Sequence, residues 1–255
     1  MPELPEVEMY KRYFEQHALG QTITRVRVLD ARICGTRKLD QLAGRSFQRV
    51  RRHGKHLFAD AGAGDLWLHM HFGMSGDLAF FIDEPPRFAR LIFDFENGAH
   101  LAYEDMRLFG IVDLTPSPDA YIDEHGLGPD PLDLHLRAFR KLLHKRRGRI
   151  KALLLAQDVI AGIGNLYADE ALFRSSIDPR RPVDHLSDAE LRTLFTNIRG
   201  VLRQTIAFKS EGQDYPPRFL VQHREEGHRC PKCGGTIRRT IVAGRTTYYC
   251  ARHQK

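Results

Sequence analysis

Three cysteines and one histidine close to the C-terminus constrain the fold more than any other feature of the sequence. They form two close pairs, Cys230 with Cys233 and Cys250 with His253, in the pattern C-x2-C-x16-C-x2-H. Two such pairs fit a single tetrahedral Zn²⁺, and four protein ligands leave no open position, so the ion is expected to be structural. A chance spacing of unrelated thiols is the alternative.

The residues between the two pairs predict a β-hairpin. Two glycines that follow the first pair allow a tight turn. Strands are expected at Thr236–Val242 and Arg245–Tyr249, joined by a two-residue turn. Residues 221–255 are therefore predicted to form a zinc-clipped β-hairpin.

The first part of the chain predicts a helix followed by an antiparallel β-sandwich. Val7, Tyr10, Phe14 and Ala18 share one helical face. Short β-rich segments follow, separated by Gly, Pro, Asn and Asp, and this pattern is typical of a sandwich or barrel. The expected strands are Thr22–Leu29, Ser46–Val50, His56–Asp60, Leu66–Phe72, Asp77–Phe81, Phe88–Phe95, His100–Tyr103 and Gly110–Leu114.

The pattern changes at the end of the predicted sandwich domain, residues 1–114. Residues 115–133 are rich in proline and acidic residues and are expected to be a linker, and residues 134–220 have helical spacing. The helices expected there are Leu134–Lys145, Ile150–Ala156, Asn165–Arg174 and Asp188–Phe208. The predicted fold class is α+β, with an N-terminal sandwich, a helical domain and the zinc hairpin.

The positive charge is concentrated at the C-terminal end. Residues 201–255 hold 11 Lys and Arg against four Asp and Glu, a surplus equal to the formal net charge of the whole chain, +7. A basic block favours a polyanionic partner, because neutralising phosphates supplies affinity that does not depend on sequence. A solvated basic tail explains the charge equally well. Arg245, at the tip of the predicted hairpin, is placed to reach a nucleic-acid backbone or groove.

The sequence indicates neither a membrane protein nor a secreted one. No stretch approaches the roughly 18 apolar residues that a membrane span needs. The N-terminal segment is acidic and has no apolar run. A cytoplasmic protein without a membrane partner is expected, and a monomer is the simplest expectation.

A glycine-rich turn precedes the predicted helix that begins at Asn165. Gly162 and Gly164 let the backbone approach a partner closely, and Asn165 is expected to be the N-cap. Because exposed amides at a helix N-terminus form an anion site, the turn is predicted to bind phosphate. An ordinary turn is the alternative.

The chain carries a proline directly after the initiator methionine. If Met1 is removed, Pro2 has a free secondary amine, and an α-amino group with a pKa of about 8 is neutral at pH 7 far more often than a lysine. A neutral amine is what Schiff-base chemistry at a sugar C1′ requires. Glu3 is then a candidate general acid and base. Helix-start chemistry explains the same residues and is the alternative interpretation.

Several motifs follow one another in a single order along nearly the whole chain. They are PELPEVE, GKHLF, GMSG, MRLFG, LGPDPL, the run from IKALLL through IAGIGNLYADEALF, and the terminal hairpin. The chain thereby resembles the formamidopyrimidine-DNA glycosylase / endonuclease VIII family, and the formamidopyrimidine branch more closely. The resemblance implies a base-excision-repair glycosylase with AP lyase activity on double-stranded DNA that contains damaged bases or abasic sites. It also implies a bacterial-type protein associated with the nucleoid.

The resemblance implies the chemistry of three residues at the N-terminus. Pro2 would displace the damaged base and form a covalent iminium with the deoxyribose. Glu3 would protonate the opening sugar and assist successive β- and δ-elimination, and Glu6 would support Glu3.

The resemblance further implies a set of residues that bind the DNA around the lesion. Lys55, Asn165 and Arg245 would contact phosphates. Met74 would fill the space of the flipped base, Arg107 would hydrogen-bond the orphaned base, and Phe109 would wedge the stack, since unstacking must be offset by replacement contacts.

Two positions depart from the family pattern. His253 stands where bacterial members usually have cysteine, and histidine is an ordinary zinc ligand. Residues 209–218 form a shorter segment, with Pro216-Pro217, than the glycine-rich loop that closes over flipped 8-oxoguanine in the family.

Three hypotheses about the activity follow. The first is action on oxidised purines, namely formamidopyrimidines and 8-oxoguanine. The alternatives are an endonuclease VIII-like preference for oxidised pyrimidines or another lesion, and a non-catalytic damaged-DNA-binding protein. The presence of Pro2, Glu3 and Lys55 speaks against the non-catalytic alternative.

Overall fold

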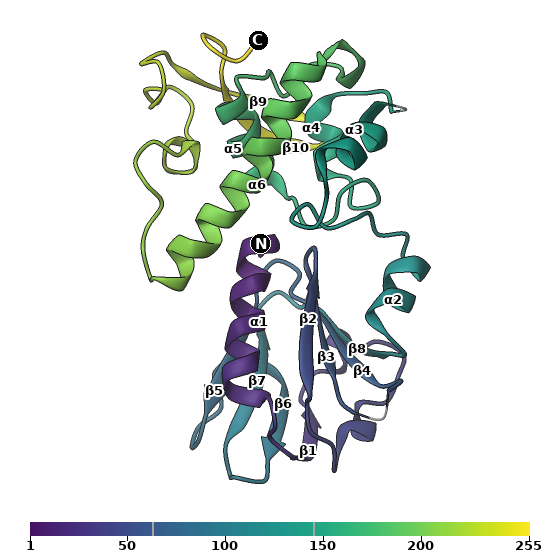
Figure 1. Cartoon of the computed structure of the whole chain (residues 1–255). Helices are drawn as coiled ribbons and strands as arrows, with labels where there is room; N and C mark the ends of the chain where they lie inside the picture. The colour runs from purple at the N-terminus through teal and green to yellow at the C-terminus, as the bar shows by residue number, and fades with distance from the viewer. Residues whose placement is uncertain (63, 145) are drawn as a thin grey trace. The chain divides into compact units, whose positions relative to one another are not determined.

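The chain forms two compact units, Met1–Gly126 and Leu127–Lys255, in a computed structural model that describes residues 1–62, 64–144 and 146–255 (Figure 1). The first unit is a β-sandwich with an N-terminal helix. The second is helical and ends in a β-hairpin. The predicted α+β class is confirmed. No helix in the described ranges is long and apolar enough to cross a membrane.

The sandwich consists of two four-stranded antiparallel sheets, with strand orders β1-β6-β7-β5 and β2-β3-β4-β8. The strands are β1 (Ile23–Val28), β2 (Arg49–His53), β3 (His56–Asp60), β4 (Trp67–His71), β5 (Gly76–Phe81), β6 (Ala89–Phe95), β7 (His100–Asp105) and β8 (Ile111–Thr115). Each expected strand is present. The largest shift is at β2, which begins three residues later than predicted, because Ser46 and Phe47 make only isolated bridges to Thr22 and Leu19.

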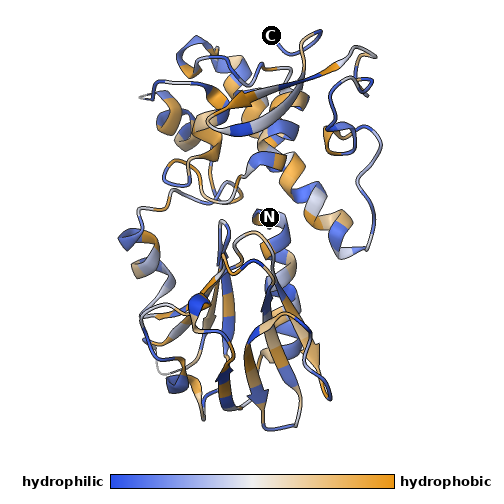
Figure 2. Ribbon diagram, turned by 180° about the vertical axis from the view of Figure 1, so that it is seen from behind, coloured by the Kyte–Doolittle hydropathy of each residue, from blue (hydrophilic) through white to orange (hydrophobic). Residues whose placement is uncertain are grey.

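Helix α1 (Leu4–Ala18) contributes an apolar face to the core between the sheets. Val7, Phe14 and Ala18 are fully buried in the same cluster as the inward residues of the strands. The Phe14 ring packs edge-on against Phe47, with ring centroids 4.9 Å apart. Hydrophobic and hydrophilic bands alternate along the strands in Figure 2, as expected where one face of each sheet is buried. The helix is therefore a structural part of the sandwich.

A short helix, α2 (Pro118–Glu124), lies within the segment that the sequence predicts to be a linker. Ser117 is its N-cap and accepts a hydrogen bond from the Ala120 amide at 3.0 Å, while Pro118 occupies the first turn. The Tyr121 ring lies 4.0 Å from the His69 ring, centroid to centroid, so the helix is docked on the sandwich. Proline and acidic residues, which suggested a linker, here stand in the first turn of a helix, where Pro118 and Asp119 are favourable.

The second unit contains four α-helices and the hairpin among its described residues. They are α3 (Leu136–His144), α4 (Ile150–Leu155), α5 (Asn165–Ser175), α6 (Asp188–Ser210), β9 (Ile237–Val242) and β10 (Arg245–Cys250). At the hairpin tip, Ala243 and Gly244 have φ values of +49° and +70°. Positive φ at both central residues is the type I′ geometry that matches the twist of a two-stranded ribbon.

A cluster of histidines lies on the sheet that contains β3 and β4. His69 is fully buried, and its Nε2 lies 2.9 Å from Nδ1 of His56. Burial, followed by the charges of His71 and His125, lowers the pKa of His69 to about 3. Burial, followed by the charge of Lys55, lowers the pKa of His71 to about 4. Both rings are therefore neutral in the folded protein at neutral pH.

We expect acid to destabilise the first unit through these histidines. The unfolded chain protonates them below a pKa of about 6.5, whereas the folded chain does not until pH approaches about 4 or 3. Lowering the pH from 7.5 to 5 should cost roughly 2 kcal/mol of unfolding free energy per histidine. The only tryptophan of the sequence, Trp67 in β4, allows urea unfolding of this unit to be followed by fluorescence.

His69→Phe is the matched variant for this measurement, since it keeps an aromatic ring against Tyr121. It should lose about 2 kcal/mol less than the wild type between the two pH values. An equal loss in both proteins would contradict the assignment.

Candidate active site and metal centre

The start of α1 is held by a reciprocal pair of hydrogen bonds. Glu3 is the N-cap, its amide donates to Glu6 Oε2 at 2.9 Å, and its side chain accepts from the Glu6 amide. Glu3 is only 3% exposed, whereas Pro2 and Glu6 are partly exposed. The helix-start interpretation of these residues is therefore correct as far as it goes. The same hydrogen bonds also fix the position of the Glu3 carboxylate, in the residue that directly follows Pro2.

Lys55 lies in the two-residue turn between β2 and β3, where Gly54 adopts a φ of +55°. The Lys55 side chain is mostly buried, and its charge acts on His71 at the end of β4. Lysines are mostly exposed, and the sequence alone is compatible with a solvated surface residue here. Lys55 is instead only 9% exposed. His71 is a neighbour of Lys55 that the sequence did not single out, because the two are 16 positions apart.

Met74, Arg107 and Phe109 lie on two loops of the first unit. Met74, in the loop between β4 and β5, is 41% exposed, and Phe109, in the loop between β7 and β8, is 55% exposed. The Arg107 guanidinium lies 5.1 Å from the centre of the Phe109 ring. Leu108, between them, has a φ of +58° and packs against the core. Met106 on the second loop is also exposed, so the loops present three large apolar side chains and the cation of Arg107 to solvent.

The prediction that Asn165 caps α5 is wrong. The N-cap is Gly164, and Asn165 is the first residue of the helix. Its side-chain amide instead donates to the backbone oxygen of Thr246 in β10 at 2.9 Å, so it reaches across to the hairpin rather than back to its own helix. The preceding turn uses the freedom of glycine at Gly162, where φ is +99°.

A buried charge network fixes the hairpin on α5. Lys151 and Asp169 have fully buried side chains that pair at 2.6 Å, and the Lys151 ammonium also donates to Thr247 Oγ1 at 2.7 Å. Asp169 accepts from the Tyr248 amide at 3.2 Å and pairs with Arg224 at 3.2 Å. The Asn165 side chain binds Thr246, and Arg245 directly precedes Thr246 in the chain. The docked hairpin therefore brings Asn165 and Arg245, the two predicted phosphate ligands of the second unit, close together.

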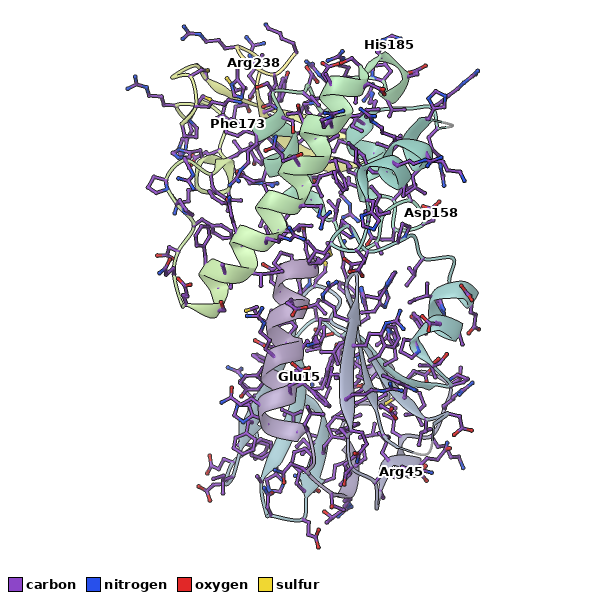
Figure 3. All side chains as sticks on the ribbon, in the orientation of Figure 1. Glu15, Arg45, Asp158, Phe173, His185 and Arg238 are labelled. Atoms are coloured by element: carbon purple, nitrogen blue, oxygen red, sulfur yellow. The ribbon has the colours of Figure 1, made fainter. Side chains whose placement is uncertain are left out.

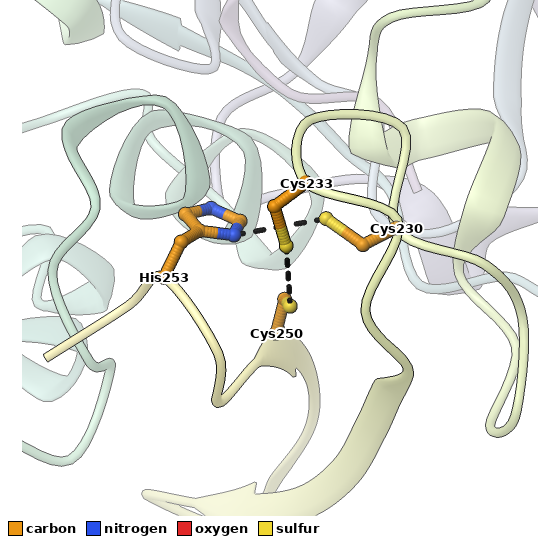
Figure 4. Close-up of side chains that lie close together, drawn as sticks. All are labelled: Cys230, Cys233, Cys250 and His253. Atoms are coloured by element: carbon orange, nitrogen blue, oxygen red, sulfur yellow. Dashed lines mark hydrogen bonds between the residues drawn. The ribbon is translucent and has the colours of Figure 1, made fainter.

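The four predicted metal ligands converge at one point in the structure. One ligand atom of each of Cys230, Cys233, Cys250 and His253 lies within 4.8 Å of all the others. Sγ of Cys230 is 3.6 Å from Nδ1 of His253, and the Sγ atoms of Cys233 and Cys250 are 3.6 Å apart (Figure 4). Ligands at about 2.3 Å from a tetrahedral zinc are separated by roughly 3.5–3.8 Å. The donor set and its spacing therefore fit one structural Zn²⁺.

The surroundings of His253 select the nitrogen that faces the metal. Its other ring nitrogen, Nε2, lies 3.3 Å from the backbone oxygen of Phe173 on α5, a residue labelled in Figure 3. Donation of the Nε2 proton to that carbonyl leaves Nδ1 free to bind zinc, the usual arrangement around a ligating histidine. Phe173 also belongs to a small buried cluster with Leu220, Ile237 and two of the cysteines, so a zinc ion held by the four ligands would join the hairpin to α5.

Comparison with known proteins matches three consecutive family models to the chain. They are the N-terminal domain of formamidopyrimidine-DNA glycosylase at residues 1–112, its H2TH domain at 127–215, and the zinc finger found in FPG and IleRS at 227–253. The formamidopyrimidine-DNA glycosylase of Pelotomaculum thermopropionicum is 38% identical, over all of this chain and 99% of that protein. The enzyme of Desulforamulus reducens is 37% identical with the same coverage.

Solved structures of the same family share the fold over their full length. A structure of MutM in complex with DNA containing carbocyclic 8-oxo-G matches with a TM-score of 0.88 and 30% identity, covering 100% of both chains. Lactococcus lactis Fpg in complex with DNA containing an abasic site matches with a TM-score of 0.87 and 30% identity, covering 99% of both chains. Sandwich, helical unit and zinc finger together define a zinc-finger DNA-repair fold. The chain belongs to the formamidopyrimidine-DNA glycosylase family.

We expect zinc removal to affect one unit only. Chelation should raise backbone hydrogen exchange across β9 and β10, because a hairpin with so small a core depends on its metal. The fluorescence of Trp67, which lies in the other unit, should not change. His253→Cys should keep one equivalent of zinc, whereas His253→Ala should bind it at least about tenfold more weakly.

Cys34→Ser is the control for the zinc measurements, since Cys34 is a free cysteine of the first unit outside the cluster. Its zinc content should equal that of the wild type. A zinc affinity of His253→Ala equal to that of the wild type would show that histidine is not a ligand.

Proposed function

We propose that this protein attacks oxidised purines in duplex DNA through the nitrogen of Pro2, after removal of Met1. Membership of its family makes it a DNA glycosylase of base excision repair with AP lyase activity. The observation that carries the proposal is the start of α1, where Pro2 directly precedes a buried carboxylate held by a capping box. An unprotonated secondary amine beside a fixed carboxylate is what covalent catalysis at C1′ needs.

In the proposed reaction the Pro2 nitrogen uses its lone pair to form a bond to C1′, and the bond from C1′ to the damaged base breaks. The base leaves with the bonding pair and takes up a proton, and the Pro2 nitrogen loses the proton that it carried. Glu3 donates a proton to the sugar ring oxygen as the C1′–O4′ bond opens, which gives the iminium. Loss of a proton from C2′ then expels the 3′-phosphate, and a second elimination expels the 5′-phosphate. Glu6 supports Glu3 through the capping hydrogen bonds.

The remaining predicted residues hold the DNA in this proposal. Lys55, Asn165 and Arg245 bind phosphates, and the zinc keeps the hairpin of Arg245 folded. Met74, Arg107 and Phe109 replace the contacts that the flipped base loses; their exposure on two loops supports this role. Since the substrate is chromosomal DNA and the relatives are bacterial, we place the enzyme in the cytoplasm at the nucleoid.

A preference for oxidised pyrimidines, as in endonuclease VIII, is the second candidate. It is favoured by the short segment 209–218, which begins in the last turn of α6. The Tyr215 hydroxyl lies 2.8 Å from that of Tyr167 on α5, and Gln222 donates to the Tyr215 backbone oxygen at 2.5 Å. Phe219 is fully buried under the guanidinium of Arg174, at 3.8 Å. A segment tied down in this way is less free to close over a large flipped base.

Glu3→Gln should separate capping from catalysis. A glutamine oxygen still accepts from the Glu6 amide, so the stability of the first unit should change by less than about 1 kcal/mol. Loss of the proton donor should lower the single-turnover rate by about a hundredfold or more. Glu15→Gln, at the other end of α1 (labelled in Figure 3), should leave the rate unchanged. A Glu3→Gln enzyme within twofold of the wild type would rule out the assigned role.

Borohydride trapping on two duplexes should decide the substrate. One carries 8-oxoguanine opposite cytosine and the other an oxidised pyrimidine. We expect the covalent adduct chiefly on 8-oxoguanine, and Pro2→Gly should reduce trapping and abasic-site cleavage. An adduct chiefly on the pyrimidine would replace the first candidate with the second. A Pro2→Gly variant that cleaves abasic DNA as well as the wild type would disprove the proposed nucleophile.

A further inference from the structure

Asp105, the last residue of β7, is a fully buried carboxylate that no step of the proposed reaction uses. Its Oδ1 accepts hydrogen bonds from the Ser75 hydroxyl at 2.5 Å and from the Arg107 amide at 3.1 Å. Its Oδ2 accepts from the Gly110 amide at 2.7 Å. The Arg107 amide also donates to Ser75 Oγ at 3.0 Å. One carboxylate therefore ties the loop between β4 and β5 to both ends of the loop between β7 and β8.

The same two loops touch through their backbones. Gly73 has a φ of +51°, and a Cβ there would lie 2.4 Å from the carbonyl carbon of Phe109. A Cβ at Gly110 would lie 1.8 Å from the Tyr103 hydroxyl, which itself donates to the His71 backbone oxygen at 2.9 Å. Neither glycine leaves room for a side chain. The two loops are thus packed together as one body beneath their exposed side chains.

The side chains on this body have little packing of their own. Met74 directly precedes Ser75, and Arg107 and Phe109 lie between the two amides that bind Asp105. A group that fills the space of a flipped base must hold its place against the bases that would restack. Exposed side chains can do so only if the backbone beneath them is fixed.

We propose that Asp105 and Ser75 are positioning residues that hold Met74, Arg107 and Phe109 at the geometry needed to open the lesion pair. The inference rests on the proposed function of these three residues and deepens it. Burying a carboxylate is costly unless several hydrogen bonds offset its desolvation, and an apolar residue at the same place is often as stable. The inference gives a reason for the carboxylate of Asp105 at this buried position.

Ser75→Ala tests the inference, because it removes the hydroxyl that bridges Asp105 and the Arg107 amide. Single-turnover excision of a damaged base from a duplex should fall about tenfold. Cleavage of a single-stranded oligonucleotide with a preformed abasic site should not change, since no base pair has to be opened there. Ser75→Thr keeps the hydroxyl and should keep the duplex rate. Asp105→Asn should act in the same direction as Ser75→Ala.

A double-mutant cycle separates positioning from general stability. If Ser75 acts through the loop of Phe109, adding Ser75→Ala to Phe109→Ala should lower the duplex rate by a smaller factor than Ser75→Ala does in the wild type. Glu104, the neighbouring acid on β7, pairs with β5 and β6 through its backbone, and its side chain makes no hydrogen bond within the described residues. Glu104→Gln should therefore match the wild type on both substrates. The Trp67 unfolding curve of each variant reports whether the first unit remains folded.

Two results would overturn the inference: an equal loss on the duplex and single-stranded substrates, or additive losses in the cycle. If the wild-type protein cleaves neither substrate, the proposed function itself fails and this inference fails with it. Cleavage of the single strand by the wild type therefore distinguishes the two failures.

Discussion

Chain termini fray unless packing and hydrogen bonds hold them, and the proposed chemistry needs the first residues of this chain at a fixed place. The burial of α1 in the sandwich meets that need. Leu4 and Val7 are fully buried one turn from Pro2, and the Glu3–Glu6 capping box fixes the backbone where the helix begins. The core that stabilises the first unit therefore also positions its N-terminal nitrogen. In the proposed reaction, capping and catalysis are two uses of the same residues.

In the second unit, the hairpin is held in place by a buried ion pair and by the zinc ligands. Among the described residues, the apolar cluster beneath the hairpin contains five buried members, too few to hold two strands in water. Four zinc ligands close one side of the hairpin, and the buried Lys151–Asp169 pair attaches the other side to α5. Removing one partner of such a pair leaves an uncompensated buried charge, so the arrangement is specific as well as stable. It places Arg245 and Asn165 beside the same backbone residue, Thr246.

The sequence predicted the elements well where the signal is local. Alternating strands, the helical face of α1 and the ligand pairs are all short-range patterns, and the zinc-ligand spacing remained informative although His253 replaces a cysteine. Prediction failed where tertiary contacts decide: Asn165 turns to the hairpin instead of capping α5, and Tyr121 docks a helix in the expected linker. Lys151 and Asp105 were not singled out, because charged residues are expected at the surface and nothing local marks a buried one.

Locating the covalent bond to DNA is the most direct test of whether the nitrogen of Pro2 is the nucleophile, as we propose. Protein verified to begin at Pro2 would be reduced with borohydride while it reacts with an abasic duplex, then digested and analysed by tandem mass spectrometry. We expect a deoxyribose remnant on the nitrogen of Pro2 and no other modified residue. A remnant on a lysine such as Lys55, or an equal yield of adduct from protein that retains Met1, would contradict it.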